Sequence, residues 1–325
     1  AHYAGGVGVV SSNLTGPTIF FSTISSFQLA IMNKTFTVGW LGTGVMGLSM
    51  ANHLLNEGLS LTLFTRTRSK ADPLLAKGAH WAASPSELAQ RSDFVFSMLG
   101  YPHDVEEIYC GENGVLAGCR PHSVLVDMTT SSPSLAVRIS KMAVGRSCHL
   151  LDAPVSGGDV GAKNGTLAIM CGGEQETFDR ALPFLRAMGD KIELFGSSGS
   201  GQRVKMANQI LIASTMVGTV EALLYAEKAK LDPSRVIGLI GQGAAGCWSI
   251  NQLGPRMVGS DWEPGFFVKH FVKDMGIALE DSKQMGLELK GLALASEFYE
   301  RVEKEGFSEK GTQVLLKVLR KMNES

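Results

Sequence analysis

Between residues 36 and 196, short segments that are apolar throughout alternate with helical segments, and this pattern strongly limits the possible folds. A strand with one face in solvent alternates apolar and polar residues, whereas a strand covered on both faces is apolar throughout. Alternation of such strands with helices indicates a parallel sheet with right-handed crossovers. The expected strands are FTVGWLG, LTLFT, FVFSML, SVLVDM, HLLDAPV, LAIMCGG and IELFG, with helices over 46–56, 85–91, 133–144 and 174–188.

The strand pattern ends near Gly201, and helical segments follow up to residue 321. The first, from 201 to 225, is apolar on nearly every face, which is typical of a buried helix. Its interior polar residues favour a protein core over a membrane span. Because 325 residues exceed what one core usually serves, we predict an α/β fold with two domains. A Rossmann-type domain with a parallel sheet occupies 34–198, and an interdomain helix with an all-helical domain for substrate binding and oligomerisation occupies 199–325.

The first 33 residues form an extension of different composition. Up to Ala30 they contain no Asp, Glu, Lys or Arg and are rich in Ser and Thr. A transit peptide is also poor in acids but rich in Arg. The segment is therefore either a degraded targeting segment or an artificial addition with Met32 as the natural start, and both a cytoplasmic and a mitochondrial location stay open.

Charge and cysteine content argue against several classes of partner. The net charge is −1 and no basic block is present, so no electrostatic feature favours nucleic acid. The five cysteines are scattered without CxxC spacing, which is typical of free thiols in a reducing compartment. We predict no metal site, because a zinc site needs clustered ligands, and no membrane partner.

A glycine motif, Gly42-x-Gly44-x-x-Gly47, lies where the first strand passes into a helix. The first glycine permits a tight turn, the second lets backbone approach a pyrophosphate, and the third lets helix pack on strand. A plain glycine turn is the alternative, but strand–helix context is what the dinucleotide motif requires. The predicted cofactor contacts here are Gly42, Gly44, Val45, Met46 and Gly47, with Met98 and Leu99 at the end of the FVFSML segment.

The segment LFTRTRSK at the end of the second strand contains no acid. A carboxylate there would hold the ribose of NAD, whereas an arginine accommodates the 2′-phosphate of NADP. We predict that Thr65, Arg66 and Thr67 bind this phosphate, with Arg66 placed best, so NADPH is preferred and NAD stays possible. The alternative is a solvated basic helix start.

Two loops that follow strands, DMTTSSP and DAPVSGG, are expected to face the nicotinamide, because ligands gather at the carboxyl ends of parallel strands. In the second loop, the hydroxyl of Ser156 and the backbone amides at Gly157 and Gly158 are suitable donors for a small carboxylate. A simple turn is the alternative.

The segment GQRVKMANQ places Lys205 at the start of the buried helix. Asn208 and Gln209 follow at i+3 and i+4 on the same face, so their amide oxygens could accept from the ammonium and direct it. An oriented, desolvated lysine can give a proton to a carbonyl oxygen. We predict that Lys205 and Asn208 are catalytic; a lysine reaching solvent from a helix start is the alternative.

With these residues, the chain resembles the β-hydroxyacid dehydrogenase family, which includes 3-hydroxyisobutyrate dehydrogenases, tartronate semialdehyde reductases and plant glyoxylate/succinic semialdehyde reductases. The resemblance extends from about residue 37 to residue 319, with DAPVSGGDVGAKNGTLAIM as its most specific motif. LGYPHDV and HFVKDMG are similar to patterns of the plant 3-hydroxyisobutyrate dehydrogenase-like subgroup. By this resemblance, Lys205 is the catalytic lysine, Ser156, Gly157 and Gly158 bind the substrate carboxylate, Thr130 contacts cofactor and substrate, Phe266 and Asp274 contact substrate, and Lys273 binds cofactor.

The resemblance implies an NADPH-preferring oxidoreductase that interconverts a small semialdehyde or keto acid with its hydroxy acid, as a homodimer or homotetramer. The candidates are glyoxylate, succinic semialdehyde and methylmalonate semialdehyde. An imine reductase on the same fold and a nucleotide-binding scaffold without turnover are the alternatives, and Lys205 argues against both. Gln209 and Thr65 stand where the family usually has Asn.

Overall fold

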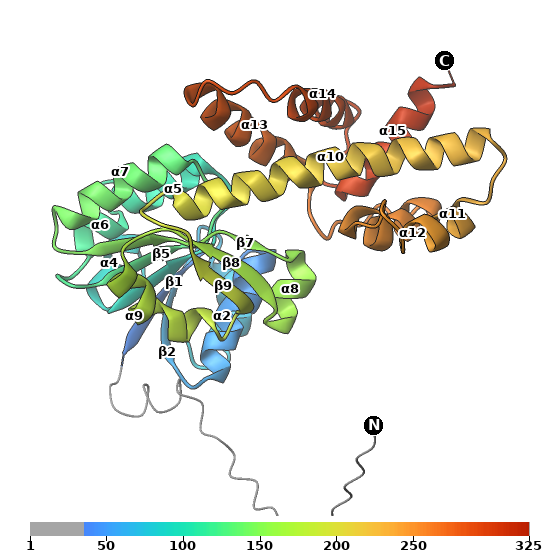
Figure 1. Cartoon of the computed structure of the whole chain (residues 1–325). Helices are drawn as coiled ribbons and strands as arrows, with labels where there is room; N and C mark the ends of the chain where they lie inside the picture. Colours follow the sequence, from blue (N-terminus) through green and yellow to red (C-terminus); the bar gives the residue numbers. More distant parts are fainter. Residues whose placement is uncertain (1–35, 325) are drawn as a thin grey trace, which may run out of the picture. The chain divides into compact units, whose positions relative to one another are not determined.

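A computed structural model describes residues 36–324 of the chain, so the extension over residues 1–33 lies outside the described residues. Six parallel strands form the main sheet in the order β3-β2-β1-β4-β5-β6 (Figure 1). The central strands are buried along almost their whole length, which confirms the parallel sheet expected from their apolar sequences. The strands are β1 (Thr37–Leu41), β2 (Ser60–Phe64), β3 (His80–Trp81), β4 (Phe94–Ser97), β5 (Val124–Asp127) and β6 (His149–Asp152).

Helices cover both faces of this sheet. On one face, Leu88 packs so closely on Gly39 that a Cβ at residue 39 would collide with it. On the other, the ring of Phe184 lies 4.4 Å from that of Phe94 and 5.8 Å from that of Phe96, measured between ring centroids. The helices of this region are α2 (Val45–Asn56), α3 (Asp72–Leu75), α4 (Pro85–Gln90), α5 (Pro102–Cys110), α6 (Val115–Gly118), α7 (Pro133–Val144), α8 (Gly158–Asn164) and α9 (Gln175–Leu185).

A second, three-stranded sheet corrects the expectation that all the predicted strands join one parallel sheet. Strand β7 (Val155–Ser156) pairs antiparallel with β8 (Leu167–Cys171), and β8 pairs parallel with β9 (Gly189–Leu194). The HLLDAPV segment is divided between β6 and β7 at Pro154, which has no N–H to donate to a ladder. Strands β8 and β9 are also less buried than the central strands of the main sheet, so neither is covered on both faces.

The remaining chain is helical, as predicted, and packs around one long helix, α10 (Ser200–Lys228), which runs from the sheets into the helical part (Figure 1). By length and composition α10 could cross a membrane. In this fold, however, its Met216, Val220 and Leu223 belong to the core of the helical part, together with Phe271 and Tyr299. The other helices are α11 (Pro233–Ile240), α12 (Gly254–Val258), α13 (Val268–Gln284), α14 (Lys290–Lys304) and α15 (Leu315–Met322).

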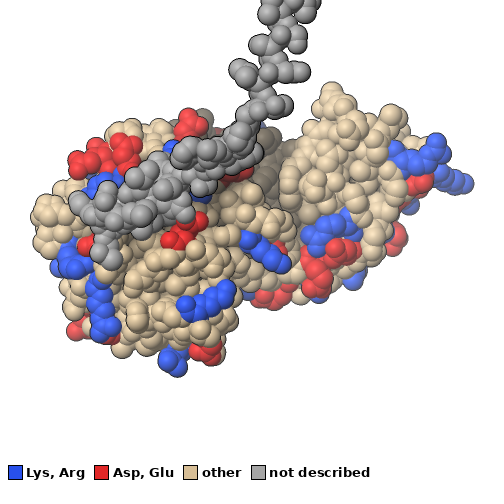
Figure 2. All heavy atoms as spheres, turned by 90° about the horizontal axis from the view of Figure 1, so that it is seen from below, with Lys and Arg blue, Asp and Glu red and all other residues tan. Residues whose placement is uncertain are grey.

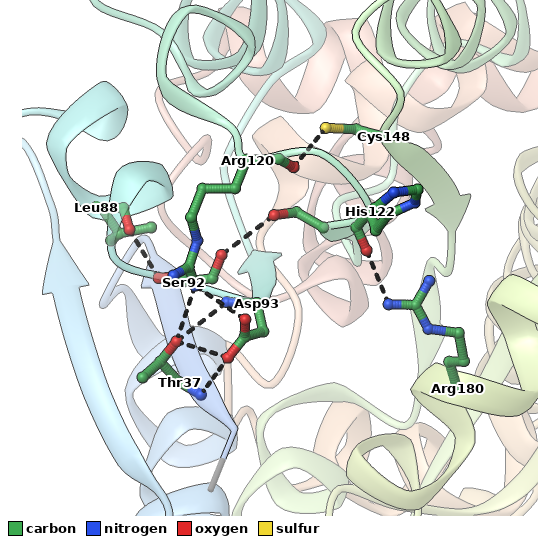
Figure 3. A network of polar contacts seen from close by, with 9 residues as sticks. Thr37, Leu88, Ser92, Asp93, Arg120, His122, Cys148 and Arg180 are labelled. Atoms are coloured by element: carbon green, nitrogen blue, oxygen red, sulfur yellow. Dashed lines mark hydrogen bonds and ion pairs between the residues drawn. The ribbon is translucent and has the colours of Figure 1, made fainter. Parts of the chain in front are cut away.

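A polar network ties the amino-terminal ends of the main strands together (Figure 3). Asp93 Oδ2 accepts from the backbone N–H and the hydroxyl of Thr37, and Asp93 Oδ1 accepts from Arg120, each at 2.9 Å. The thiol of Cys148 donates to the carbonyl of Arg120 at 3.0 Å. This network lies at the opposite end of β1 from the glycine motif and joins the start of β1 to the segments that precede β4 and β5.

Charged side chains on the face shown in Figure 2 occur as small groups of both signs among uncharged residues. The face shown therefore has no large patch of one sign, the feature that steers a polyanion onto a protein.

Candidate active site

A cavity of about 720 Å³ lies at the carboxyl ends of β1, β2, β4 and β5 and reaches the start of α13. This is where open α/β sheets bind ligands. The residues predicted to contact the cofactor all line it, together with Phe266 and Asp274. They are Gly42, Gly44, Val45, Met46, Gly47, Thr65, Arg66, Thr67, Met98, Leu99, Thr130 and Lys273.

The glycine motif has the geometry that a dinucleotide needs. Gly42 has φ +91°, and a Cβ there would collide with the carbonyl oxygen of Met98. A Cβ at Gly47 would collide with the carbonyl oxygen of Gly42, so the helix packs directly on the turn. Gly44 faces open space within 4 Å and caps the start of α2. Backbone amides at this helix start are therefore accessible to a pyrophosphate.

The loop after β2 presents fewer cations to the cavity than its sequence suggests. Arg66 and Lys70 line the cavity, whereas the guanidinium of Arg68 lies over the ring of Trp81, 5.5 Å from its centroid. Arg66 Nη1 lies 2.8 Å from Asp104 Oδ1, an acidic partner from α5 that the sequence did not reveal.

Lys205 lies in the second turn of α10 with 6% of its surface exposed. Burial lowers the pKa of Lys205 to about 8; the negative charge of Asp274 opposes this change and the positive charge of Lys273 adds to it. A lysine of this kind is protonated at neutral pH yet gives up its proton readily. It therefore has the protonation behaviour that general acid–base catalysis needs.

The amides after Lys205 are arranged differently from our expectation that both accept from the ammonium. Asn208 Nδ2 donates to Gln209 Oε1 at 2.7 Å, and Gln209 Nε2 donates to Asp274 Oδ2 at 2.6 Å. Glutamine is one methylene longer than the asparagine usual at this position, and its amide contacts α13. Within residues 36–324 neither amide oxygen accepts from Lys205, so this prediction was wrong for both Asn208 and Gln209.

Asp274 connects this chain of amides to the loop after β5. Lys273 Nζ lies 3.0 Å from Asp274 Oδ1 and donates to the carbonyl of Thr130 at 2.7 Å. Asp274 is 1% exposed. Pattern alone would have classed these residues as ordinary core and surface of a helix, and only the family resemblance singled them out.

Two residues that our sequence analysis missed fix the start of α10. Asp152 accepts from the backbone N–H groups of Gly199 and Gln202 at 2.7 and 2.9 Å. Burial raises the pKa of Asp152 to about 6, against the opposing effect of these two hydrogen bonds. The side chain of Gln202 donates to the carbonyl of Thr129 and accepts from the N–H of Ser131. The sequence did offer one signal for Gln202, because a glutamine one turn before Lys205 in a buried helix needs hydrogen-bond partners.

The predicted carboxylate loop lies beside the cavity and does not line it. Gly157 and Gly158 have φ +134° and +63°, which favour glycine, and a Cβ at Gly158 would lie 3.3 Å from the carbonyl oxygen of Gly265. Asp159 and Gly265 line the cavity, whereas Ser156, Gly157, Gly158, Lys205 and Asn208 are not among its lining residues. Within residues 36–324, no hydrogen bond or ion pair joins Lys205 to this loop, so their shared role stays a prediction.

Comparisons with known proteins agree with this architecture. Residues 37–196 match the family model described as the NAD binding domain of 6-phosphogluconate dehydrogenase, and residues 199–319 match the model described as NAD-binding of NADP-dependent 3-hydroxyisobutyrate dehydrogenase. The chain is 49% identical to an uncharacterized oxidoreductase of Bacillus subtilis, over 87% of this chain and 98% of that protein. It is also 49% identical to a probable mitochondrial 3-hydroxyisobutyrate dehydrogenase-like protein of Arabidopsis thaliana, over 97% and 94% of the two chains. A solved structure of Mycobacterium tuberculosis 3-hydroxyisobutyrate dehydrogenase with L-serine is 29% identical, with a TM-score of 0.82 over 88% of this chain and 100% of that chain.

Proposed function

Because the chain belongs to the β-hydroxyacid dehydrogenase family, we propose that it reduces a small semialdehyde or keto acid with NADPH and that Lys205 is the general acid. Family membership makes the chain an NAD(P)-dependent hydroxyacid dehydrogenase. The observation that supports the finer proposal is the buried Lys205, whose pKa is about 8 and is influenced by the charge of Asp274, a residue that lines the cavity.

Each part of the site has a separate task in this proposal. The amides of the glycine motif and Arg66 hold the cofactor, which supplies the hydride. The hydroxyl of Ser156 and the amides at Gly157 and Gly158 hold the substrate carboxylate. Lys205 gives a proton to the carbonyl oxygen during reduction and takes it back during oxidation, as a general acid and base. Asn208 donates to Gln209, which in turn donates to Asp274 and so holds the carboxylate whose charge acts on the ammonium of Lys205.

Lys205 also separates this proposal from its rivals. An imine reductase has no need of a lysine that gives a proton to a carbonyl oxygen beside a carboxylate-binding loop. A scaffold without turnover has no reason to bury an ammonium, since burying a charge costs several kcal/mol in real proteins.

The proposal is tested with a panel of short acids and both cofactors. We expect NADPH-dependent reduction of at least one of glyoxylate, succinic semialdehyde and methylmalonate semialdehyde, measured by loss of absorbance of the reduced nicotinamide. The names of the Arabidopsis and Mycobacterium relatives favour a three-carbon β-hydroxy acid skeleton. Turnover of cyclic imines with no turnover of any acid would contradict the proposal.

We propose a homodimer or homotetramer formed through an exposed face of α10. Leu211 and Tyr225 are 66% and 75% exposed, and Gly218 between them faces open space within 4 Å. Residues seven apart share one helix face, so these three lie on one exposed stripe of α10, which also carries Ser214 and Glu221. Sedimentation velocity at micromolar concentration should give at least twice 34.7 kDa. Leu211→Glu should shift the mass toward the monomer, and Val144→Glu, at a valine equally exposed on α7, should not. A single 34.7 kDa species for the unaltered protein would refute this assembly.

We propose that the domains divide at 198/199, because α10 begins at Ser200.

We propose that residues 1–33 are a targeting segment and not an artificial addition. The alignment with the Arabidopsis protein covers 97% of this chain and so includes part of that segment. The mitochondrial name of that relative favours the mitochondrion over the cytoplasm, and a fluorescent fusion of residues 1–33 would test this location.

A further inference from the structure

The arginine at the phosphate end of the cavity already has an acidic partner in this structure. The side chain of Asp104 is 5% exposed, whereas that of Arg66, 2.8 Å away, is 72% exposed. Asp104 Oδ2 accepts from the backbone N–H of Tyr101 at 3.1 Å. Asp104 Oδ1 lies near Arg66 and, at 3.7 Å, near His103 Nε2, and it accepts no hydrogen bond within the described residues. One oxygen therefore caps α5 and the other faces Arg66.

The ion pair joins two walls of the cavity. Arg66 follows β2, and Asp104 lies in α5 after β4, with β1 between these strands in the sheet. Neighbouring strands are about 4.8 Å apart, so the two walls are separated by about 10 Å. The pair thus bridges the strand whose end carries the glycine motif. Glu107 and Glu112 line the same wall as Asp104, and Lys70 lines the wall of Arg66.

We propose that Asp104 determines cofactor specificity by competing with the 2′-phosphate of NADPH for Arg66. The inference rests on the proposed role of Arg66 in binding that phosphate. A 2′-phosphate at Arg66 draws the guanidinium away and adds negative charge near a buried carboxylate, both of which are unfavourable. The ribose hydroxyl of NADH is neutral and leaves the ion pair in place. Asp104 therefore lowers the affinity for NADPH and leaves the affinity for NADH unaffected, so that both cofactors can bind.

The test is Asp104→Asn in the full chain, with the dissociation constants of NADPH and NADH measured by fluorescence titration without substrate. Asparagine keeps the size of the side chain and an oxygen for the N–H of Tyr101. We expect affinity for NADPH to rise about tenfold, which corresponds to about 1.4 kcal/mol, and affinity for NADH to change by less than about threefold. The affinity for adenosine 2′,5′-bisphosphate should change as that for NADPH does, and the affinity for 5′-AMP should change as that for NADH does.

Two further comparisons make the result specific. Glu107→Gln removes another acid of the same helix and the same wall and should leave the ratio of the two affinities unchanged. In an Arg66→Gln background, the gain in NADPH affinity from Asp104→Asn should fall below about threefold, because the guanidinium for which Asp104 and the phosphate compete is no longer present. Asp104→Ser, which keeps an oxygen acceptor at the start of α5, serves as a second variant if Asp104→Asn folds poorly.

Several outcomes would overturn the inference. An equal gain for both cofactors would mean that the pair obstructs the cavity for any dinucleotide. A weaker affinity for NADPH would mean that Asp104 orients Arg66 for the phosphate. A loss for both cofactors with a lower melting temperature would mean that Asp104 only caps α5. If Arg66→Gln leaves NADPH affinity unchanged, the cofactor assignment itself fails; if it weakens NADPH while Asp104→Asn gives no gain, only this inference fails.

Discussion

Lys205→Met is expected to lower turnover 100- to 10,000-fold for every acid substrate, because a positioned general acid contributes about 10²–10⁴ in rate, or about 3–5 kcal/mol. The missing proton is common to all the substrates, so the loss should not depend on the length of the acid. Cofactor affinity should change little, since Lys205 is not among the residues that line the cofactor cavity. Steady-state kinetics with saturating NADPH, together with a fluorescence titration of NADPH, measures both effects.

The same substitution should make the protein more stable at neutral pH. The pKa of Lys205 in the folded protein, about 8, lies below its value of 10.5 without burial, so folding disfavours the charged form. This cost is fully present below pH 8 and disappears as pH rises from 8 to 10.5. Removing the charge should raise the free energy of unfolding at pH 7 by up to about 3 kcal/mol.

For the unaltered enzyme, the rate of reduction should fall as pH rises through about 8, because Lys205 then loses the proton that it gives to the substrate.

Two controls accompany this variant. Lys228→Met changes an exposed lysine at the far end of the same helix and should leave turnover unchanged. Asn208→Ala should lower turnover less than Lys205→Met, because it removes only the donor to Gln209. If Lys205→Met folds, binds NADPH and retains turnover within tenfold of the unaltered enzyme, Lys205 is a structural residue.

Arg66→Asp is expected to weaken NADPH binding at least 10- to 100-fold and to leave NADH equal or better. A charge-assisted hydrogen bond contributes about 1.5–3 kcal/mol, and about 1.4 kcal/mol is tenfold in affinity. The introduced carboxylate adds repulsion toward the phosphate but can accept from the ribose hydroxyls of NADH. Dissociation constants of both cofactors measure the change.

Arg68→Asp is the matched control, because Arg68 lies in the same loop but stacks on Trp81 outside the cavity. It should leave the ratio of the two affinities unchanged. A preference for NADH in the unaltered protein, or an equal effect of both variants, would contradict the assignment of the phosphate to Arg66.

The sequence by itself determined those features that depend on neighbours along the chain. Continuous apolar runs revealed the buried strands, because a strand covered on both faces has no polar position. The spacing of Gly42, Gly44 and Gly47 located the nucleotide end, since each glycine answers a steric need of the local strand–helix turn. All three glycines line the cavity, as this local reasoning predicts.

The tertiary structure alone decided which distant side chains meet. Gln209 contacts Asp274 across 65 residues, and Asp152 holds Gln202 across 50 residues. Asp104 reaches Arg66 because β2 and β4 flank β1 in the parallel sheet, so the segments that follow them lie at the same end of the sheet. A buried polar or charged side chain is paired with a group that tertiary packing brings next to it, whatever the distance between the two along the chain. Local spacing carries no information on that pairing, so the acidic partner of Arg66 and the charges that act on Lys205 emerged only from the fold.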